Sequence, residues 1–283
     1  MAKGVLLPLV ESGLTEARRS LPLLPGTGYI RASSLATRCP RAEVLASRHG
    51  VVREDVEDAT SLLTYAHGHG LHYALQNHVL PKVGVLIGKW ICLDCGKVYG
   101  APGETTIRVE DGLPPLELDQ ILVPRPEKCE RCHSKDFHYR EIGFSAPDYS
   151  TGGHPDGYLR VPGMEGLGLL EAKSTQKIWE VRATPYIEHV LQVQTYLWFT
   201  GLLWAVILYW AKDGQGPSAL VEHLVLRDEE TIASIKAMLA TIWDGVGGGA
   251  IPEPLCQSKD APRAKRCALR GYCFAEDPCP PTP

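Results

Sequence analysis

The chain has 283 residues, of which 44% are hydrophobic and 22% charged, and this is enough for one substantial core with one or two small satellite modules. With 29 Lys and Arg against 33 Asp and Glu, the formal net charge of -4 excludes a uniformly basic nucleic-acid binder. No apolar run reaches the roughly 20 residues of a membrane helix. Residues 1–7 carry Lys3 and lack a cleavage site, so we expect a cytoplasmic protein without a membrane span.

Two helices are predicted in the first part of the chain. Apolar residues recur at helical spacing over residues 35–48, and either Ser33 or Ser34 is positioned to cap this segment. Pro40 marks a kink in it or divides it into a turn and a following helix. A second helical pattern covers residues 56–79.

Residues 89–140 differ in composition from their surroundings and indicate an inserted module. They are rich in Pro, Gly and Glu and contain two C-x2-C pairs, with Trp90, Tyr99 and Phe137 available for a small apolar core. The paired residues are Cys92, Cys95, Cys129 and Cys132. Cytosolic reductants disfavour disulfides, and two such pairs favour a tetrahedral structural zinc site. We therefore predict a zinc ribbon whose role is stabilisation, substrate guiding or partner docking.

After the module, strands and helices alternate. Residues 157–161 and 168–172 form a predicted hairpin around the turn residues Pro162 and Gly163. It is followed by a helix over residues 184–200, a buried strand over 203–210, an alternating strand over 219–226, and a helix from Asp228, its cap, to Trp243. This order predicts an α/β fold with a mixed central sheet.

The hairpin carries the sharpest chemical signal. His154-Pro155-Asp156-Gly157 is followed on the next predicted strand by Glu171-Ala172-Lys173. Two carboxylates brought together on a bent hairpin can hold Mg²⁺ or Mn²⁺ with coordination left over for phosphate and water. Glu171 and Lys173 share one face of the strand, where the lysine is positioned to orient or deprotonate a water molecule. Taken singly, each motif is an ordinary turn or solvated pair, so their order and spacing carry the prediction.

The order and spacing of Asp156, Glu171 and Lys173 resemble the PD-(D/E)xK nuclease motif. The glycine-rich segment 68–72, Gly-His-Gly-Leu-His, resembles the glycine-to-histidine helix motif of the RecB-like branch of that superfamily. The resemblance makes His72 the matching metal ligand. The alternative is a histidine-rich helix surface.

A downstream motif strengthens the same resemblance. Gln192 and Tyr196 lie four residues apart, hence on one helical face, and resemble the Gln-x-x-x-Tyr motif of the RecB-like branch. The resemblance implies that Gln192 positions catalytic groups and that Tyr196 lies near the DNA path. Gln194 is the competing register, and a surface Gln with a half-buried Tyr is the alternative.

The two ends of the chain resemble the iron-sulfur nucleases of this branch, including those of CRISPR adaptation and of many bacteriophages. The resemblance implies a four-iron four-sulfur cluster held by one early cysteine and three late ones. The matching residues are Cys39, Cys256, Cys267 and Cys273. Because the family's usual C-x2-C is replaced here by Cys256-x10-Cys267, Cys279 is a rival ligand, and zinc or unligated thiols are the alternatives.

Together these motifs imply a restriction-endonuclease-like core and a metal-dependent DNA exonuclease acting on single-stranded or end-frayed DNA in recombination, repair or phage DNA processing. Recombination or replication proteins are possible partners. The implied division is an N-terminal helical part over residues 1–88, the zinc ribbon over 89–140, the nuclease core over 141–246 and a cluster-binding tail over 247–283. A non-catalytic zinc- and iron-sulfur-binding module for nucleic acid or complex assembly, and a site-specific endonuclease, are the alternatives.

Overall fold

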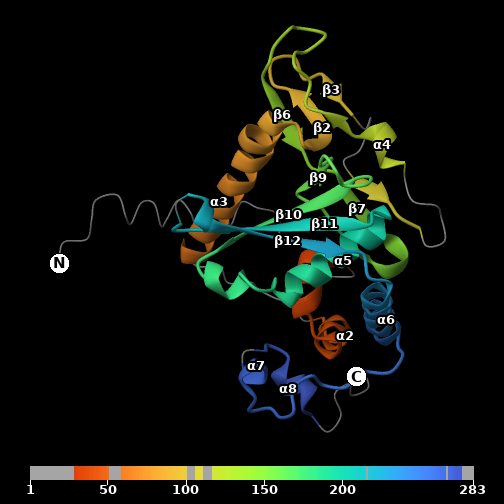
Figure 1. Ribbon diagram of the computed structural model, residues 1–283. Coiled ribbons are helices and arrows are strands. Elements are labelled where there is room, and N and C mark those ends of the chain that lie inside the picture. The colour runs from red at the N-terminus through yellow and green to blue at the C-terminus, as the bar shows by residue number, and fades with distance from the viewer. Residues whose placement is uncertain are drawn as a thin grey trace.

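Two β-sheets and the helices packed against them make up the computed structural model of the chain (Figure 1). The structure describes residues 29–50, 59–100, 106–110, 117–214, 216–265 and 267–275, so the start of the predicted second helix and Cys279 lie outside the described residues. No helix in this part of the chain has both the length and the apolar character of a membrane span.

The larger sheet has eight strands and runs through the centre of the molecule. Its strands are β2 (Leu86–Cys92), β3 (Val98–Tyr99), β5 (Val123–Pro124), β6 (Phe137–Arg140), β9 (Gly157–Leu159), β10 (Gly168–Thr175), β11 (Trp204–Ala211) and β12 (Leu220–Leu226). They follow the order β12-β11-β10-β9-β2-β3, with β5 and β6 also paired to β2. β10 and β11 run parallel and the other pairs antiparallel, which confirms the predicted mixed sheet.

The local sequence explains the central strands. β11 is apolar along its whole length because it lies between β10 and β12, whereas β12 at the sheet edge alternates in exposure. The predicted hairpin is present as β9 and β10, and Gly163 in its turn adopts a φ of 84°, which favours glycine. The predicted strands agree with the observed ones within a few residues.

A second, four-stranded sheet was not predicted. It contains β1 (Ile30–Arg31), β4 (Thr106–Arg108), β7 (Gly143–Ala146) and β8 (Thr151–Gly153), in the order β1-β8-β7-β4. Strands of two to four residues are too short to show an alternating pattern. The sheet fastens the early segment to the chain just before Asp156, since the Thr151 hydroxyl donates to the Ile30 carbonyl at 2.7 Å.

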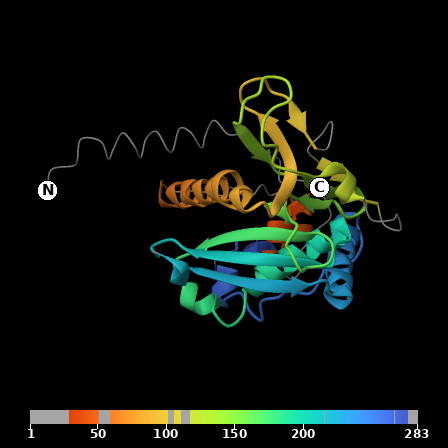
Figure 2. The ribbon, with the colours of Figure 1, turned by 45° about the horizontal axis from the view of Figure 1, so that its top comes forward.

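The helices surround the larger sheet. The α-helices are α2 (Pro40–Arg48), α3 (Ala59–Ala74), α4 (Leu118–Ile121), α5 (Ile187–Thr200), α6 (Glu229–Val246), α7 (Pro262–Lys265) and α8 (Arg270–Cys273). Short 3-10 helices cover Ala32–Thr37, Leu80–Val83, Pro147–Tyr149, Ile178–Val181 and Pro217–Ala219. α5 packs against β10 and β11, α6 against α5, and α2 against α6. In Figure 2, α3 lies on the same side of strands β10 to β12 as the part of the sheet formed by β2, β3 and β6.

The predicted helix over residues 35–48 is divided in two. Ser33 and Ser34 lie within a 3-10 helix and cap no α-helix, whereas Pro40 occupies the first turn of α2. Proline is well suited to a helix start but forces the preceding residue, Cys39, into an extended conformation. Of the two alternatives for Pro40, the division into a turn and a following helix is therefore correct.

The predicted second helix changes character near its end. After Ala74 the backbone continues as a π-helix, Leu75–Val79, in which Gln76 and Asn77 are buried and Val79 is exposed. Val79 is exposed because a π-turn holds an extra residue and rotates the side chains that follow it. This rotation directs two amides toward the sheet.

The two later helices follow the prediction more closely. α5 begins at Ile187, after Pro185, which is a few residues later than expected. Asp228 caps α6 as predicted, since its carboxylate accepts the Glu230 amide at 3.0 Å, and the helix continues to Val246.

The apolar core of the cysteine module is continuous with the larger sheet. Trp90 and Phe137 belong to the same buried cluster as Leu170 and Trp204 of the central strands, and Tyr99 packs at its border. The continuity arises because β2 pairs with β9 at one end and with β3 and β6 at the other. The module is thus an outgrowth of a shared strand, and the sheet and the module share one core.

Candidate active site and metal centres

The residues predicted to form an active site come together where three elements meet. α3 and α5 both contact β10, and the loop before β9 reaches the same place. The side chains concerned are His72 on α3, Asp156 before β9, Glu171 and Lys173 on β10, and Gln192 and Tyr196 on α5.

Asp156 connects the helix to the hairpin. Its Oδ1 lies 3.0 Å from Nδ1 of His72, and its Oδ2 accepts the Ala172 amide at 2.6 Å. Burial would lower the pKa of His72, but the hydrogen bond and charge of Asp156 outweigh it and raise that pKa above its usual value. The contact with the backbone of β10 therefore fixes a buried carboxylate beside a histidine.

Glu171 is buried and only half satisfied. Its Oε1 lies 2.6 Å from Nζ of Lys173 and accepts Nε2 of Gln192 at 2.7 Å, whereas Oε2 is buried without a hydrogen-bond partner. Burial and the nearby charge of Asp156 raise the pKa of Glu171 to about 7, against the opposing effect of Lys173. A buried carboxylate oxygen with no partner is costly unless a cation occupies the adjacent space.

The α5 residues hold Glu171 in place. Nε2 of Gln192 lies 3.1 Å from the Tyr196 hydroxyl, and Tyr196 is only 2% exposed. The Tyr196 ring packs so closely on Gly153 that a Cβ there would lie 2.8 Å from it. The Tyr196 ring is thus buried next to Gln192, and its implied position near the DNA path stays a prediction.

The competing assignments on the two helices resolve by geometry. Gln194 donates to the Leu226 carbonyl at 2.7 Å and accepts the Asp228 amide at 3.0 Å, so it joins β12 to α6 and does not contact Glu171. His67 and His69 are exposed on α3, and among the described histidines only His72 contacts Asp156.

Glu141 is a site residue that the sequence did not reveal. One of its carboxylate oxygens lies within 4.8 Å of the ligand atoms of both His72 and Asp156. Nε2 of Gln76 holds it by donating to Glu141 Oε1 at 2.8 Å and to the Asp156 carbonyl at 2.7 Å. Burial, followed by the charge of Asp156, raises the pKa of Glu141. An acidic residue directly after the alternating strand β6 is the signal that could have located it.

The side chains His72, Glu141, Asp156 and Glu171 are called the acidic site below. Three carboxylates and an imidazole offer the oxygen and nitrogen ligands that Mg²⁺ and Mn²⁺ use. The unpartnered Oε2 of Glu171 and the mutual repulsion of the carboxylates show that the site fits a divalent cation.

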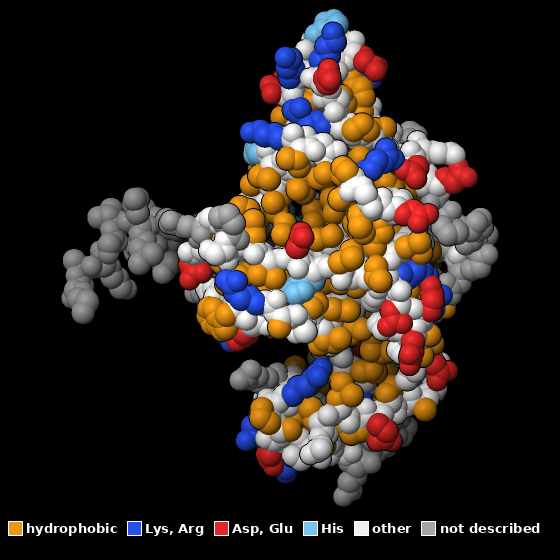
Figure 3. Space-filling model, in the orientation of Figure 1, with side chains coloured by type: hydrophobic (Ala, Val, Ile, Leu, Met, Phe, Trp, Pro, Cys, Tyr) orange, Lys and Arg blue, Asp and Glu red, His pale blue; other side chains and the backbone are white. Residues whose placement is uncertain are grey.

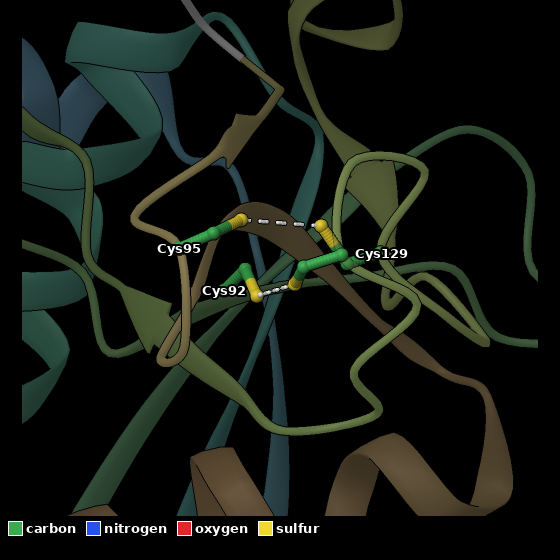
Figure 4. A group of neighbouring side chains, drawn as sticks. Cys92, Cys95 and Cys129 are labelled. Atoms are coloured by element: carbon green, nitrogen blue, oxygen red, sulfur yellow. Dashed lines mark hydrogen bonds between the residues drawn. The ribbon is translucent and has the colours of Figure 1, made fainter.

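A second candidate metal centre lies in the module. Cys92, Cys95, Cys129 and Cys132, called the four-cysteine cluster below, place all their sulfur atoms within 4.8 Å of one another. Figure 4 shows Cys92, Cys95 and Cys129 directed toward a common point, and the sulfurs of two pairs, 92–132 and 95–129, lie 3.5 Å apart. Ligands at about 2.3 Å around a tetrahedral zinc ion would be about 3.8 Å apart, so the spacing fits zinc.

The two C-x2-C loops have the same backbone shape. The Gly96 amide donates to the Cys92 carbonyl at 2.9 Å, and the His133 amide donates to the Cys129 carbonyl at 2.8 Å. Gly96 and His133 adopt φ values of 70° and 62°, which lie in the left-handed region. Each loop is therefore a tight turn that points two thiols to one side.

Four thiols this close cannot all ionise without a cation. A hydrogen bond from the Ser134 amide favours the Cys132 thiolate, but burial and the neighbouring sulfurs outweigh it and raise the pKa of Cys132 to about 12. Burial opposes the Cys129 thiolate, yet hydrogen bonds from Tyr99 and from backbone amides lower the pKa of Cys129 to about 6. A bound cation would stabilise the remaining thiolates.

The predicted iron-sulfur ligands come together in part. Cys39, Cys267 and Cys273 pack around one small apolar cluster formed by α2 and the C-terminal segment. Arg41 ties the two segments by donating to the Cys273 carbonyl at 3.1 Å. Among the described residues that form this cluster, Cys256 is not present. The early cysteine and two of the three late ones thus pack on one apolar cluster, but among the described residues their sulfur atoms do not form a group within 4.8 Å of one another.

Comparisons with known proteins yield distant similarities. No protein-family model matches the sequence, and no curated protein matches it. The chain is similar to LHK-Exo, an alkaline exonuclease from Laribacter hongkongensis, in complex with dAMP, with 15% identity and a TM-score of 0.43 over 79% of this chain and 90% of that chain. For the protein SSO0001 the identity is 16% and the TM-score 0.40 over 89% and 90%. For a phage-related exonuclease from Haemophilus somnus they are 12% and 0.32 over 78% and 94%.

Proposed function

We propose that the chain is a divalent-metal-dependent nuclease that hydrolyses DNA phosphodiester bonds. In this proposal His72, Glu141, Asp156 and Glu171 hold Mg²⁺ or Mn²⁺, and Lys173 acts on the attacking water. The observation that carries the proposal is the half-satisfied Glu171: one oxygen is held by Lys173 and Gln192, and the other is buried without a partner.

The remaining roles follow from the contacts. A bound cation would polarise the phosphate and lower the pKa of a bound water molecule. The Lys173 ammonium, 2.6 Å from Glu171, stabilises negative charge or moves a proton next to that carboxylate. Gln192 and Tyr196 are positioning residues, because they hold Glu171 from the buried side.

The finer assignments rest on the sequence motifs. We infer an exonuclease acting on single-stranded or end-frayed DNA from the resemblance to RecB-like nucleases. A site-specific endonuclease has the same catalytic residues and is the alternative to be tested. A non-catalytic binding module is disfavoured because Asp156, Glu171 and Lys173 are all present and close together. Asp156 contacts the backbone of β10, the strand that carries Glu171 and Lys173, and these two side chains contact each other.

The decisive experiment compares cleavage of end-labelled single-stranded and duplex DNA by the wild-type chain and by Lys173→Ala, with Mg²⁺ or Mn²⁺. Removal of a group that stabilises transition-state charge is expected to lower turnover by about a hundredfold or more, with little change in folding or DNA affinity. The pattern of labelled products separates an exonuclease from an endonuclease. Full activity in Lys173→Ala would remove that residue from the mechanism, and no cleavage by the wild type would favour the binding module.

We further propose that the four-cysteine cluster binds structural zinc and that Cys39, Cys267 and Cys273, with Cys256 or Cys279, bind an iron-sulfur cluster. The first assignment is supported by the 3.5 Å sulfur pairs and the second by the meeting of both chain regions. Anaerobically purified protein is expected to be brown, and Cys267→Ser is expected to lose the colour and not the zinc. A colourless wild-type protein that is no more stable than Cys267→Ser would contradict the iron-sulfur assignment.

A further inference from the structure

Three aromatic rings lie together on the surface where α3 meets the module. The Tyr73 ring stacks on His138 with centroids 5.7 Å apart and an interplanar angle of 29°, and His78 packs on its edge at 5.3 Å. Tyr73 is 47% exposed, and His78 is exposed as well. An exposed tyrosine contributes little to a core, so this arrangement needs another explanation than burial.

The positions of the rings are fixed by a buried amide. The Asn77 side chain donates to the Tyr73 carbonyl at 3.1 Å and accepts the Tyr139 amide at 2.7 Å, which joins the π-helix to β6. Phe137 and Tyr139 direct their side chains into the core, so His138 and Arg140 share the opposite, outer face of the strand. A guanidinium therefore lies beside the ring stack.

Each of the two elements that carry these rings also carries a residue of the acidic site. Tyr73 follows His72 directly on α3, and Arg140 directly precedes Glu141 at the end of β6. Gln76, between the two ring-bearing turns, holds both Glu141 and the Asp156 backbone. Figure 3 shows Lys, Arg and His side chains around the end of the molecule formed by β2, β3 and β6, interspersed with Asp and Glu.

We propose that Tyr73, His78 and His138 form a stacking platform for an unpaired nucleobase next to the scissile phosphate, and that Arg140 binds the adjoining backbone phosphate. The proposal rests on the proposed nuclease function and deepens it, because a flat ring surface accepts any base and requires a base that is not paired. The module would then contribute one side of the substrate site, which gives it a role in guiding single-stranded DNA.

The test measures binding of fluorescein-labelled oligothymidylate to full-length Lys173→Ala protein with Mg²⁺ present, with and without the additional change Tyr73→Ala. Stacking is worth about 1–3 kcal/mol per base, so Tyr73→Ala is expected to weaken binding about tenfold. Tyr73→Phe retains the ring and is expected to bind like its parent. His138→Ala, which alters the other half of the stack, is expected to weaken binding in the same direction.

Oligonucleotides with a single abasic position separate stacking from charge. At the position that meets the platform, loss of the base is expected to weaken binding to the parent protein and to have no further effect on Tyr73→Ala. Tyr272→Ala is the matched control, because Tyr272 is also exposed and stacks on a histidine, His49, at 4.1 Å, on α8 at the opposite end of the molecule in Figure 1. Loss of the base is expected to weaken DNA binding to Tyr272→Ala as much as it weakens binding to the parent protein.

Two results would overturn the platform. Either Tyr73→Ala binds intact DNA as tightly as its parent, or it weakens binding to intact and abasic DNA equally at every position; the rings would then only join α3 to β6. Hydrolysis of a nitrophenyl phosphodiester by Tyr73→Ala with Lys173 intact keeps the two proposals apart. Unchanged hydrolysis with altered DNA binding supports both, whereas absence of hydrolysis in the wild type contradicts the nuclease and leaves the binding measurements as the test of the platform.

Discussion

The four-cysteine cluster and the acidic site are both groups of metal-ligand side chains, but they differ in chemistry and in completeness. The cluster offers four sulfur atoms within 4.8 Å of one another, on two tight turns of the same kind. The acidic site offers oxygens and one imidazole from separate elements, beside a lysine. A closed set of four protein ligands is typical of structural zinc, and an incomplete set leaves room for water and substrate.

The difference also appears in how each group is supported. The cysteines are held by backbone hydrogen bonds within their own loops, so a short sequence specifies them. The acidic site is held by groups from distant segments, since the side chains of Gln76 and Gln192 and the backbone amide of Ala172 each fix one carboxylate. Removal of the metal from the four-cysteine cluster is therefore expected to lower the stability of the protein, and removal of the metal from the acidic site is expected to lower its activity.

The largest effect is expected from Cys129→Ser. Cys129 is fully buried in the core that the module shares with the sheet, so loss of its thiolate is expected to release zinc and to destabilise β2. Several kcal/mol at roughly 2–4 °C per kcal/mol predicts a fall in Tm of about 10 °C or more. Calorimetry and zinc analysis measure both changes, with Glu171→Gln as a control that keeps its zinc. Retained zinc and an unchanged Tm would place the metal elsewhere.

A change at the acidic site is expected to spare stability and to alter the metal requirement. Glu141→Gln keeps the shape and the contact with Gln76 but removes a charge within 4.8 Å of His72 and Asp156. The Mg²⁺ concentration for half-maximal cleavage is expected to rise about 10–100-fold. Titration of activity with Mg²⁺ measures this, and Glu222→Gln, at an exposed position on β12, is the control. An unchanged Mg²⁺ requirement would exclude Glu141 from the site.

Substitutions of two glutamines on α5 distinguish a side chain that positions Glu171 from one that only stabilises the fold. Gln192→Leu is expected to lower turnover about tenfold, because it releases Glu171, and also to cost stability, because the buried Tyr196 hydroxyl loses its partner. Gln194→Leu is expected to keep turnover and to cost about 1–3 kcal/mol, because it leaves the Leu226 carbonyl and the Asp228 amide unpaired. Turnover and urea denaturation of both variants provide the measurement. Equal loss of activity in the two would mean that α5 acts through general packing.

The sequence was sufficient where one short segment specifies the geometry. The hairpin that carries Asp156, Glu171 and Lys173, the cap at Asp228 and the two cysteine turns all depend on local spacing and turn residues. It was insufficient where distant segments meet. Gln76 of the π-helix holds Glu141 in the site, and no local sequence pattern indicates a π-turn.

The four short strands of the second sheet were missed for a related reason. β1 pairs with β8 across a long stretch of sequence, and neither strand is long enough to alternate visibly. The burial of Tyr196 was likewise hidden, because it depends on the absence of a side chain at Gly153 in β8. Predictions from motifs therefore located the side chains that meet around Asp156 more completely than the residues that support them.

A pH dependence of folding is also expected in the absence of Mg²⁺. Burial and Asp156 raise the pKa of Glu171 from 4.5 to about 7, so the folded chain holds this proton to a higher pH than the unfolded chain. The resulting stability is fully present below about pH 4.5 and is lost as the pH rises toward about pH 7.

Urea denaturation of the zinc-loaded protein between these values is expected to show falling stability in the wild type and a shallower fall in Glu171→Gln, which cannot ionise there. Added Mg²⁺ is expected to reduce the wild-type slope, because a bound cation favours the ionised carboxylate. Identical slopes in the two proteins would mean that Glu171 is ionised throughout this range and that Lys173 alone compensates its charge.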